Sequence, residues 1–478
     1  MKHSPFTLHL LPFTILFGVA VFLFFGLAYP HHLHYQEQYQ LFLFDSNYVW
    51  DVVRLPGGVA DLLGRFCTQF FLFAWVGAAI IAVLLSAVQL LTLRIAGSWT
   101  SQVPGAGWGW LYGLSFVPSF LLWLFLLDEN ALLGGVWAVL LTQLAVLGIM
   151  GTVMRDTNST RKRIIRTVLV ILTFLILYWI AFGGSHYNRY PTVFPTLLYA
   201  AWLSAIVLPL VVRICRKHFR FLFPHVSFPF LISYFSFLIL LFSLVWTNAN
   251  FKAEKVMGYD FMARHQQWNR ILATVNAENP NNQIGVTVQN LALAMHGFLS
   301  DHLFDYNQNG IAGLLPDVQT DATSPLPTAE AFYQLGLINV AQRTVFEAQE
   351  AILDFQKSGR CYKRLAQTNL INGNYEVARK YLLALRKTLF YRAWANETLP
   401  LLGNEKAIAE HPEYGHLRQW ACKEDYYFSD HVTPEMLEGL YKDNTDNRLA
   451  LEYLKAYYML TNDREGYTKL LRQISNKQ

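Results

Sequence analysis

Two aspartates in the first polar stretch of the chain, Asp45 and Asp51, are the side chains with the clearest chemical potential. A pair of carboxylates can hold a divalent cation or act as a general base. The two residues are six apart, so on one helix they would not share a face well. Helix capping or pairing with Arg54 is the more ordinary role for them. We therefore predict a catalytic role for Asp45 and Asp51 only if the protein is an enzyme.

The same stretch contains three histidines and a glutamate that could bind a metal, namely His31, His32, His34 and Glu37. Polar side chains at a lipid headgroup boundary are the more ordinary interpretation. The four cysteines show no metal-ligand spacing. Residues 247–478 contain no nucleophile elbow, phosphate loop, zinc motif or nucleotide fingerprint. We predict no cofactor, and a divalent metal only under the enzyme alternative.

The elements around these residues are long apolar segments. About 20 apolar residues are needed to span a bilayer as a helix. Such segments occur at 10–30, 68–93, 107–127, 131–153, 167–183, 194–212 and 228–246. The sequence therefore predicts a membrane domain at residues 1–246 with seven spans and a long outer loop at residues 31–66.

The predicted spans have no Asp, Glu, Lys or Arg in their apolar interiors, and their notable polar side chains are Gln69, Gln89 and Gln143. Ion and proton relays normally use an ionisable group inside the membrane. An ion-coupled transporter is therefore disfavoured.

Basic residues of the short loops predict the orientation of the chain. With the N-terminus inside, the cytoplasmic side collects eleven Lys and Arg residues and the opposite side collects three. We predict a multi-pass membrane protein with a cytoplasmic N-terminus and a C-terminal domain outside the cytoplasm, which in a bacterial inner membrane is the periplasm. These basic clusters account for the formal net charge of +5, so no nucleic-acid partner is expected.

Residues 247–478 have the mixed charge and helical periodicity of a soluble domain. Residues 330–355 and 361–385 each read as two helices with matching large and small residues. NGNY at residues 372–375 indicates a turn between two helices, and GNYEVAR at residues 373–379 is the best match to a known repeat. These positions resemble the tetratricopeptide repeat, although the spacing is 30 residues and the signature Trp is absent. The predicted fold class is all-α: a seven-transmembrane-helix domain followed by a soluble tetratricopeptide-like repeat domain. Such repeats commonly hold a protein or peptide partner, and a helical domain without a groove is the alternative.

Three segments together resemble an uncharacterised family of Bacteroidota inner-membrane proteins. They are LPGGVADLL at residues 55–63 leading into TQFF at 68–71, NLALA at 290–294 with Leu303 and Phe304, and the repeat region. The resemblance covers most of the chain. It implies a polytopic membrane half and a helical-repeat half, and no established activity.

The predicted topology is also similar to that of membrane-embedded C-type glycosyltransferases. That similarity implies a lipid-linked sugar donor, often a divalent metal, and Asp45 or Asp51 as the catalytic or metal-binding carboxylate. No Asp-x-Asp or Glu-x-Asp sequence occurs in the outer loop. Our first hypothesis is a non-enzymatic envelope protein that contacts the lipid bilayer and presents its second domain to a protein or peptide. The alternative is a glycosyltransferase-like enzyme at the outer membrane face.

Overall fold

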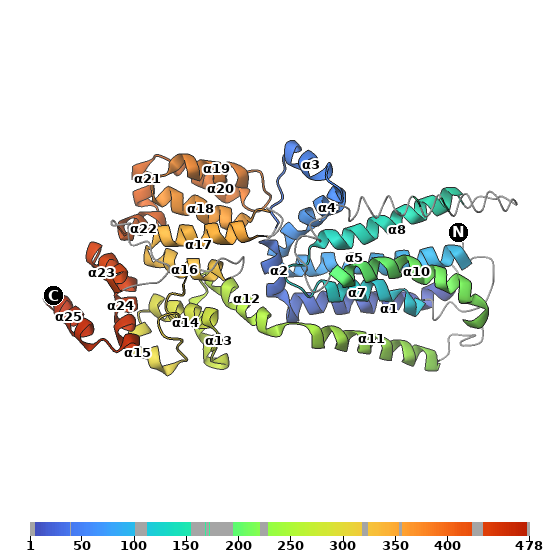
Figure 1. Ribbon diagram of the computed structural model, residues 1–478, viewed down its shortest axis with the longest axis horizontal. Coiled ribbons are helices and arrows are strands. Elements are labelled where there is room, and N and C mark those ends of the chain that lie inside the picture. The colour runs from blue at the N-terminus through green and yellow to red at the C-terminus, as the bar shows by residue number, and fades with distance from the viewer. Residues whose placement is uncertain are drawn as a thin grey trace. The chain divides into compact units, whose positions relative to one another are not determined.

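The structure, a computed structural model, describes residues 5–38, 40–100, 112–153, 168, 172, 195–219, 228–317, 324–352, 356–422 and 434–475. The chain divides into two compact units, Met1–Phe251 and Lys252–Gln478 (Figure 1). Helices make up nearly all the regular structure of the described residues, which contain no strand. The predicted all-α character is therefore confirmed.

The first unit is a set of apolar helices joined by short polar elements. In chain order they are α1 (Pro5–Leu23), the π-helical turn η1 (Phe24–Ala28), α2 (Pro30–Glu37), α3 (Ser46–Val53), α4 (Gly58–Thr68), the 3-10 turn η2 (Gln69–Leu72), α5 (Ala74–Thr100), α7 (Phe116–Phe125), α8 (Leu133–Val153), α10 (Pro195–Phe219) and α11 (Phe228–Asn248). Helix α5 packs against α1, α7, α8 and α10. Figure 1 shows α1, α5, α7 and α10 running side by side along the unit. Their core is rich in aromatic side chains, including the fully buried Phe25, Tyr29 and Trp123.

The prediction of seven spans is wrong for the described residues. Two helical segments there are long and apolar enough to cross a membrane, Leu11–Ala28 and Ala74–Ala96, and a third is added if the bent pair α11 and α12 counts as one span. Three of the other apolar runs contain shorter apolar helices, at Tyr112–Phe125, Leu133–Gly148 and Thr196–Leu208. The apolar stretches described there are shorter than the about 20 residues that a spanning helix needs. The run at 167–183 lies outside the described residues, apart from positions 168 and 172.

Side-chain hydrogen bonds join the apolar helices to one another. Thr14 of α1 donates to Gln89 Oε1 of α5 at 3.0 Å, and Gln89 Nε2 donates to the Ser115 hydroxyl before α7 at 2.7 Å. Gln143 of α8 donates to the Thr92 hydroxyl of α5 at 2.8 Å. Gln89 and Gln143 therefore form hydrogen bonds with neighbouring helices, as is common where apolar helices meet. Both are among the polar residues that stand out in the sequence.

The second unit consists of short amphipathic helices. They are α12 (Phe251–Arg264, whose first residue belongs to the first unit), α13 (Trp268–Glu278), α14 (Gln283–Met295), α15 (Leu299–His302), η4 (Leu303–Asp305), α16 (Pro325–Leu335), α17 (Ile338–Ala351), α18 (Gly359–Ile371), α19 (Tyr375–Leu385), α20 (Arg392–Thr398), η6 (Leu399–Leu401), α21 (Glu405–Glu410), α22 (Tyr414–Trp420), α23 (Pro434–Asp443), α24 (Arg448–Thr461) and α25 (Arg464–Ser475).

Helices α16, α17, α18 and α19 each pack against the next and form a stack, seen in orange in Figure 1. Gly336 ends α16 in the left-handed region with φ 94°, a conformation that glycine adopts without strain. A Cβ at this position would also lie 2.9 Å from the Trp420 carbonyl oxygen. The tight turn lets α17 fold back on α16 and bury Phe332, Leu335 and Ala341.

Candidate functional site

Asp45 lies at the start of α3 and acts as its N-cap. Its backbone is extended, with φ −142° and ψ 131°, and its Oδ1 accepts hydrogen bonds from the amides of Asn47 (3.1 Å) and Tyr48 (3.2 Å). A carboxylate in this position satisfies amides that have no partner within the helix and interacts favourably with the positive end of the helix dipole. Asp45 therefore stabilises the start of α3.

Asp51 lies near the end of the same helix and pairs with Arg54. Its Oδ1 is 3.0 Å from Arg54 Nη2, and both side chains are 59% exposed. The two predicted carboxylates thus have different partners, the backbone for Asp45 and a surface guanidinium for Asp51. Their catalytic role stays a prediction.

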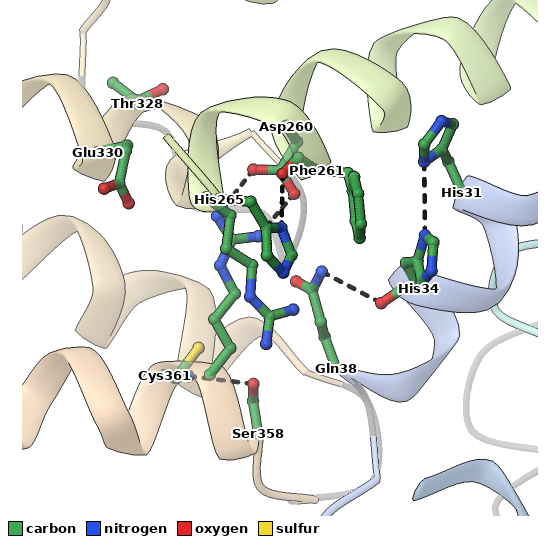
Figure 2. Close-up of polar contacts among 12 residues, drawn as sticks. His31, His34, Gln38, Asp260, Phe261, His265, Thr328, Glu330, Ser358 and Cys361 are labelled. Carbon is green, nitrogen blue, oxygen red and sulfur yellow. Dashed lines mark hydrogen bonds and ion pairs between the residues drawn. The ribbon is translucent and has the colours of Figure 1, made fainter. Parts of the chain in front are cut away.

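The histidines of the outer loop lie on α2. His32 is fully buried, with its Nε2 2.9 Å from the Leu126 carbonyl oxygen and its ring 4.6 Å from that of Tyr29. Burial lowers its pKa to about 3, so His32 is neutral and donates Nε2–H to Leu126. His31 and His34 face each other with their Nδ1 atoms 3.4 Å apart (Figure 2). Within the described residues, no three His, Cys, Asp or Glu side chains are placed to hold a metal ion.

A second ion pair in this loop was not predicted from the sequence. Arg65 Nη2 lies 2.6 Å from Asp61 Oδ2 across one turn of α4, with the side chains only 12% and 13% exposed. Arg65 Nη1 also donates to the Tyr48 hydroxyl at 3.4 Å, which links α4 to α3. Burial alone would lower the pKa of Arg65, but Asp61 and Tyr48 together raise it. The i,i+4 spacing of Asp61 and Arg65 was the available signal.

The turn between α7 and α8 carries two partly buried carboxylates. Burial raises the pKa of both Asp128 and Glu129. Asp128 Oδ1 accepts from the Asn130 amide at 2.8 Å, which stabilises the turn.

A group of interacting charged side chains lies in the second unit, on α18. Ser358 caps this helix through its hydroxyl, which accepts from the Cys361 amide at 3.2 Å (Figure 2). Arg360, Lys363, Arg364 and Gln367 then follow at positions i, i+3, i+4 and i+7, which places them on one face. We call these four residues and their partners on neighbouring helices the α18 cluster.

Two arginines of the α18 cluster form buried ion pairs. Arg360 makes two contacts with Asp260 of α12, at 2.6 and 2.8 Å, and Figure 2 shows the bonds at Asp260 as dashed lines. Arg364 Nη2 lies 2.5 Å from Glu330 Oε2 of α16, and its guanidinium lies 3.6 Å from the ring centre of Tyr333. These contacts join α18 to α12 and α16.

A third carboxylate in the α18 cluster, Glu413, accepts hydrogen bonds from two uncharged donors. Glu413 Oε1, just before α22, accepts from the Tyr333 hydroxyl at 2.8 Å and from Gln367 Nε2 at 3.0 Å. Burial raises the pKa of Tyr333 well above its ordinary value, and the nearby Glu413 raises it further, so this phenol remains protonated and donates to Glu413.

Lys363 differs from the two arginines beside it. Its ammonium lies 5.1 Å from the ring centre of Trp394 in α20, and no described carboxylate is within ion-pair distance of it. Burial lowers its pKa, and the positive charges of Arg264 and Arg364 lower it further. The sequence signal for this arrangement was the spacing of the basic residues in RCYKRLAQ at residues 360–367.

The chain matches a family of unknown function, DUF6057, over residues 5–187 and 181–478, which is nearly its whole length. No curated protein and no solved structure matches it. The predicted resemblance to a family without an established activity is confirmed at this level.

Proposed function

The chain belongs to the DUF6057 family, and we propose that it is an inner-membrane protein whose second unit binds a protein or peptide partner in the cell envelope. By its resemblance to Bacteroidota proteins, that envelope is a Bacteroidota one. The first unit anchors the chain in lipid, and the second is a tetratricopeptide-like array. The glycosyltransferase-like enzyme is the competing function.

Exposed apolar side chains on the candidate spans support the membrane anchor. Ile15 and Leu27 of the first segment are 58% and 62% exposed, and Val83 of the second is 67% exposed. Apolar surface of this extent is unusual on a protein surrounded by water, and lipid chains would cover it.

We propose a periplasmic location for the second unit. Lys2 would lie on the cytoplasmic side, the loop 31–66 outside, and Arg94 back inside at the end of α5. A third span at α11 would return the chain to the outer side. Alkaline phosphatase fused after Gln478 should then be active, and the same enzyme fused after Thr100 inactive. The opposite pattern would overturn this orientation.

The observation that carries the binding function is the stack of α16–α19 with the α18 cluster on one of its faces. Stacked helix pairs form extended surfaces that bind partner proteins, and each pair presents side chains from one helix to that surface. The contacts of Asp45 with backbone amides and of Asp51 with Arg54 support binding over catalysis, because both carboxylates have structural partners.

Site-specific photo-crosslinking in cells tests the binding function. Trp394→p-benzoylphenylalanine, beside the α18 cluster, should give one defined adduct. Leu383→p-benzoylphenylalanine, an exposed position on α19, is the matched control and should give none. Absence of an adduct at Trp394, or equal adducts at both positions, would count against a partner at this surface.

A glycan profile tests the enzyme alternative. Asp45→Asn and Asp51→Asn, introduced into a deletion strain, should leave envelope glycans and glycoproteins as in the wild type. A glycan defect in the deletion strain that either variant reproduces at normal protein level would favour the enzyme instead.

A further inference from the structure

The surface at the α18 cluster carries more positive than negative charge. Glu330, Asp260 and Arg360 lie deep, with exposed fractions of 3%, 9% and 7%. Arg264, Lys363, Arg364 and Glu413 are partly exposed. A molecule that approaches this surface therefore meets three cations and one carboxylate.

One cation on the basic face of α18, Lys363, has no ion-pair partner among the described residues. Arg360 pairs with Asp260, Arg364 pairs with Glu330, and Arg264 donates to the Tyr391 hydroxyl at 2.9 Å. Lys363 has the face of Trp394 beside it and no described carboxylate within ion-pair distance. Glu413 and Glu330 interact with this ammonium only at longer range. A partly buried ammonium without a direct ion-pair partner is unfavourable, and an incoming anion would relieve that cost.

One aromatic ring lies against this ammonium, and a second lies at the start of the same helix. Trp394 lies 5.1 Å from it, and Tyr391 packs against the start of α18, where a Cβ on Gly359 would lie 2.5 Å from the Tyr391 ring. Trp394 and Tyr391 are both partly exposed. Rings in this position can contact the aliphatic part of a peptide while the ammonium binds its charge.

We infer that Lys363, together with Trp394 and Tyr391, binds a carboxylate of an acidic peptide segment. The carboxylate belongs to an Asp or Glu side chain or to a C-terminus of the partner. This inference rests on the proposed function, because it names the partner chemistry at the α18 cluster.

The charge balance favours a carboxylate over a phosphate group. Arg360 and Arg364 already hold carboxylates, so their guanidinium forks are not available for the bidentate contacts that phosphate prefers. The described residues around Lys363 give four cations, Arg264, Arg360, Lys363 and Arg364, and three carboxylates, Asp260, Glu330 and Glu413. A ligand with a single negative charge would neutralise this excess, whereas a dianion would be repelled by Glu330 and Glu413.

Fluorescence anisotropy with the full-length protein in detergent micelles tests the inference. The probes are fluorescein-labelled hexapeptides with two glutamates or with two glutamines, each with a free or an amidated C-terminus. Wild-type protein should bind the peptides that carry a carboxylate, and the fully amidated glutamine peptide should not bind. If only amidation of the peptide abolishes binding, the bound carboxylate is a C-terminus. If only the replacement of glutamate by glutamine abolishes binding, the bound carboxylate is a side chain.

Lys363→Met removes the ammonium and should weaken binding about tenfold or more. Lys363→Arg should retain most of the binding. Lys380→Met, at an exposed position on α19, removes the same charge elsewhere and should leave binding unchanged. Unchanged binding in Lys363→Met, or equal losses in Lys363→Met and Lys380→Met, would overturn the inference. So would displacement of the peptide by inorganic phosphate at concentrations where acetate has no effect.

The photo-crosslinking assay separates failure of this inference from failure of the proposed function. If the Trp394 adduct forms as well in a Lys363→Met background as in the wild type, the partner binds without this carboxylate contact, and only the inference fails. If neither an adduct nor acidic-peptide binding is found, both fail.

Discussion

Arg360 of α18 and Asp260 of α12, one hundred residues apart in the chain, form a two-point ion pair with distances of 2.6 and 2.8 Å. Their side chains are only 8% and 12% exposed. This pair fixes the start of α18, and with it the face that carries Lys363, against the first helix of the second unit.

Removing one member of this pair should destabilise the second unit strongly. Arg360→Met leaves the Asp260 carboxylate buried without its cation, at an expected cost of about 3–5 kcal/mol. The double variant Arg360→Met with Asp260→Leu should recover much of that loss, because no buried charge remains. Denaturant unfolding of the purified protein measures both. A single variant as stable as the wild type would show that the pair contributes little.

The helical architecture of the second unit could be predicted because its signals are local. Leu365 and Ala366 on α18, and Ala378, Leu382 and Leu385 on α19, are spaced for one apolar face, and all five are buried. The turn at Gly373 separates the two helices as its sequence indicates.

The number of spans could not be predicted from hydropathy because a window of apolar residues does not reveal where a helix breaks. Phe73 is extended between η2 and α5, and a turn at Ser115 precedes α7, although both lie inside long apolar runs. The α18 cluster was missed for a different reason. Its partners Asp260, Glu330 and Glu413 come from distant parts of the chain, and only folding brings them to the basic face of α18.

Gly64 of α4 should tolerate no side chain, because the helix lies directly on the backbone of α8. A Cβ at Gly64 would lie 2.4 Å from Gly134 N and 2.7 Å from Gly134 Cα. Gly64→Ala should therefore push the helices apart and cost about 1–3 kcal/mol. Gly148→Ala, on α8 with no heavy atom within 4 Å of the new Cβ, is the control and should be neutral or stabilising. Thermal unfolding in detergent compares them, and equal stability of the two variants would contradict the close packing.

Gln89 should contribute more to the packing of the first unit than Gln69 does. Gln89→Leu removes hydrogen bonds to Thr14 and Ser115 on neighbouring elements, at an expected cost of about 1–2 kcal/mol. Gln69 donates to the Phe66 carbonyl oxygen in the same stretch of chain, so Gln69→Leu should cost less. Thermal unfolding in one detergent measures the difference. The same loss in both variants would indicate that hydrogen bonds between helices do not matter here.

Substitutions of Asp45 can separate its role as a helix cap from a chemical role. Asn caps helices about as well as Asp, so Asp45→Asn should keep stability near the wild-type value, whereas Asp45→Ala should cost about 1 kcal/mol. Asp51→Asn should change stability by less than about 0.5 kcal/mol, because its pair with Arg54 is 59% exposed on both sides. Denaturant titration of the three variants tests this order. A large loss in Asp45→Asn would show that its charge, rather than its acceptor oxygen, is what α3 needs.

His32 should make the first unit sensitive to acid. Its pKa in the folded protein is about 3, against an ordinary value of 6.5. Between these two values the unfolded chain binds a proton that the folded protein does not, so the free energy of unfolding falls as the pH falls through this window. At pH 4 the loss of stability attributable to His32 is about 3 kcal/mol, and at pH 7 it is close to zero.

Thermal unfolding of the wild type and of His32→Gln between pH 4 and pH 7.5 measures this contribution of His32 to stability. The variant should start less stable, because it loses the stacking on Tyr29, and should lose less stability on acidification. Parallel pH profiles for the two proteins would mean that His32 is not kept neutral by its surroundings.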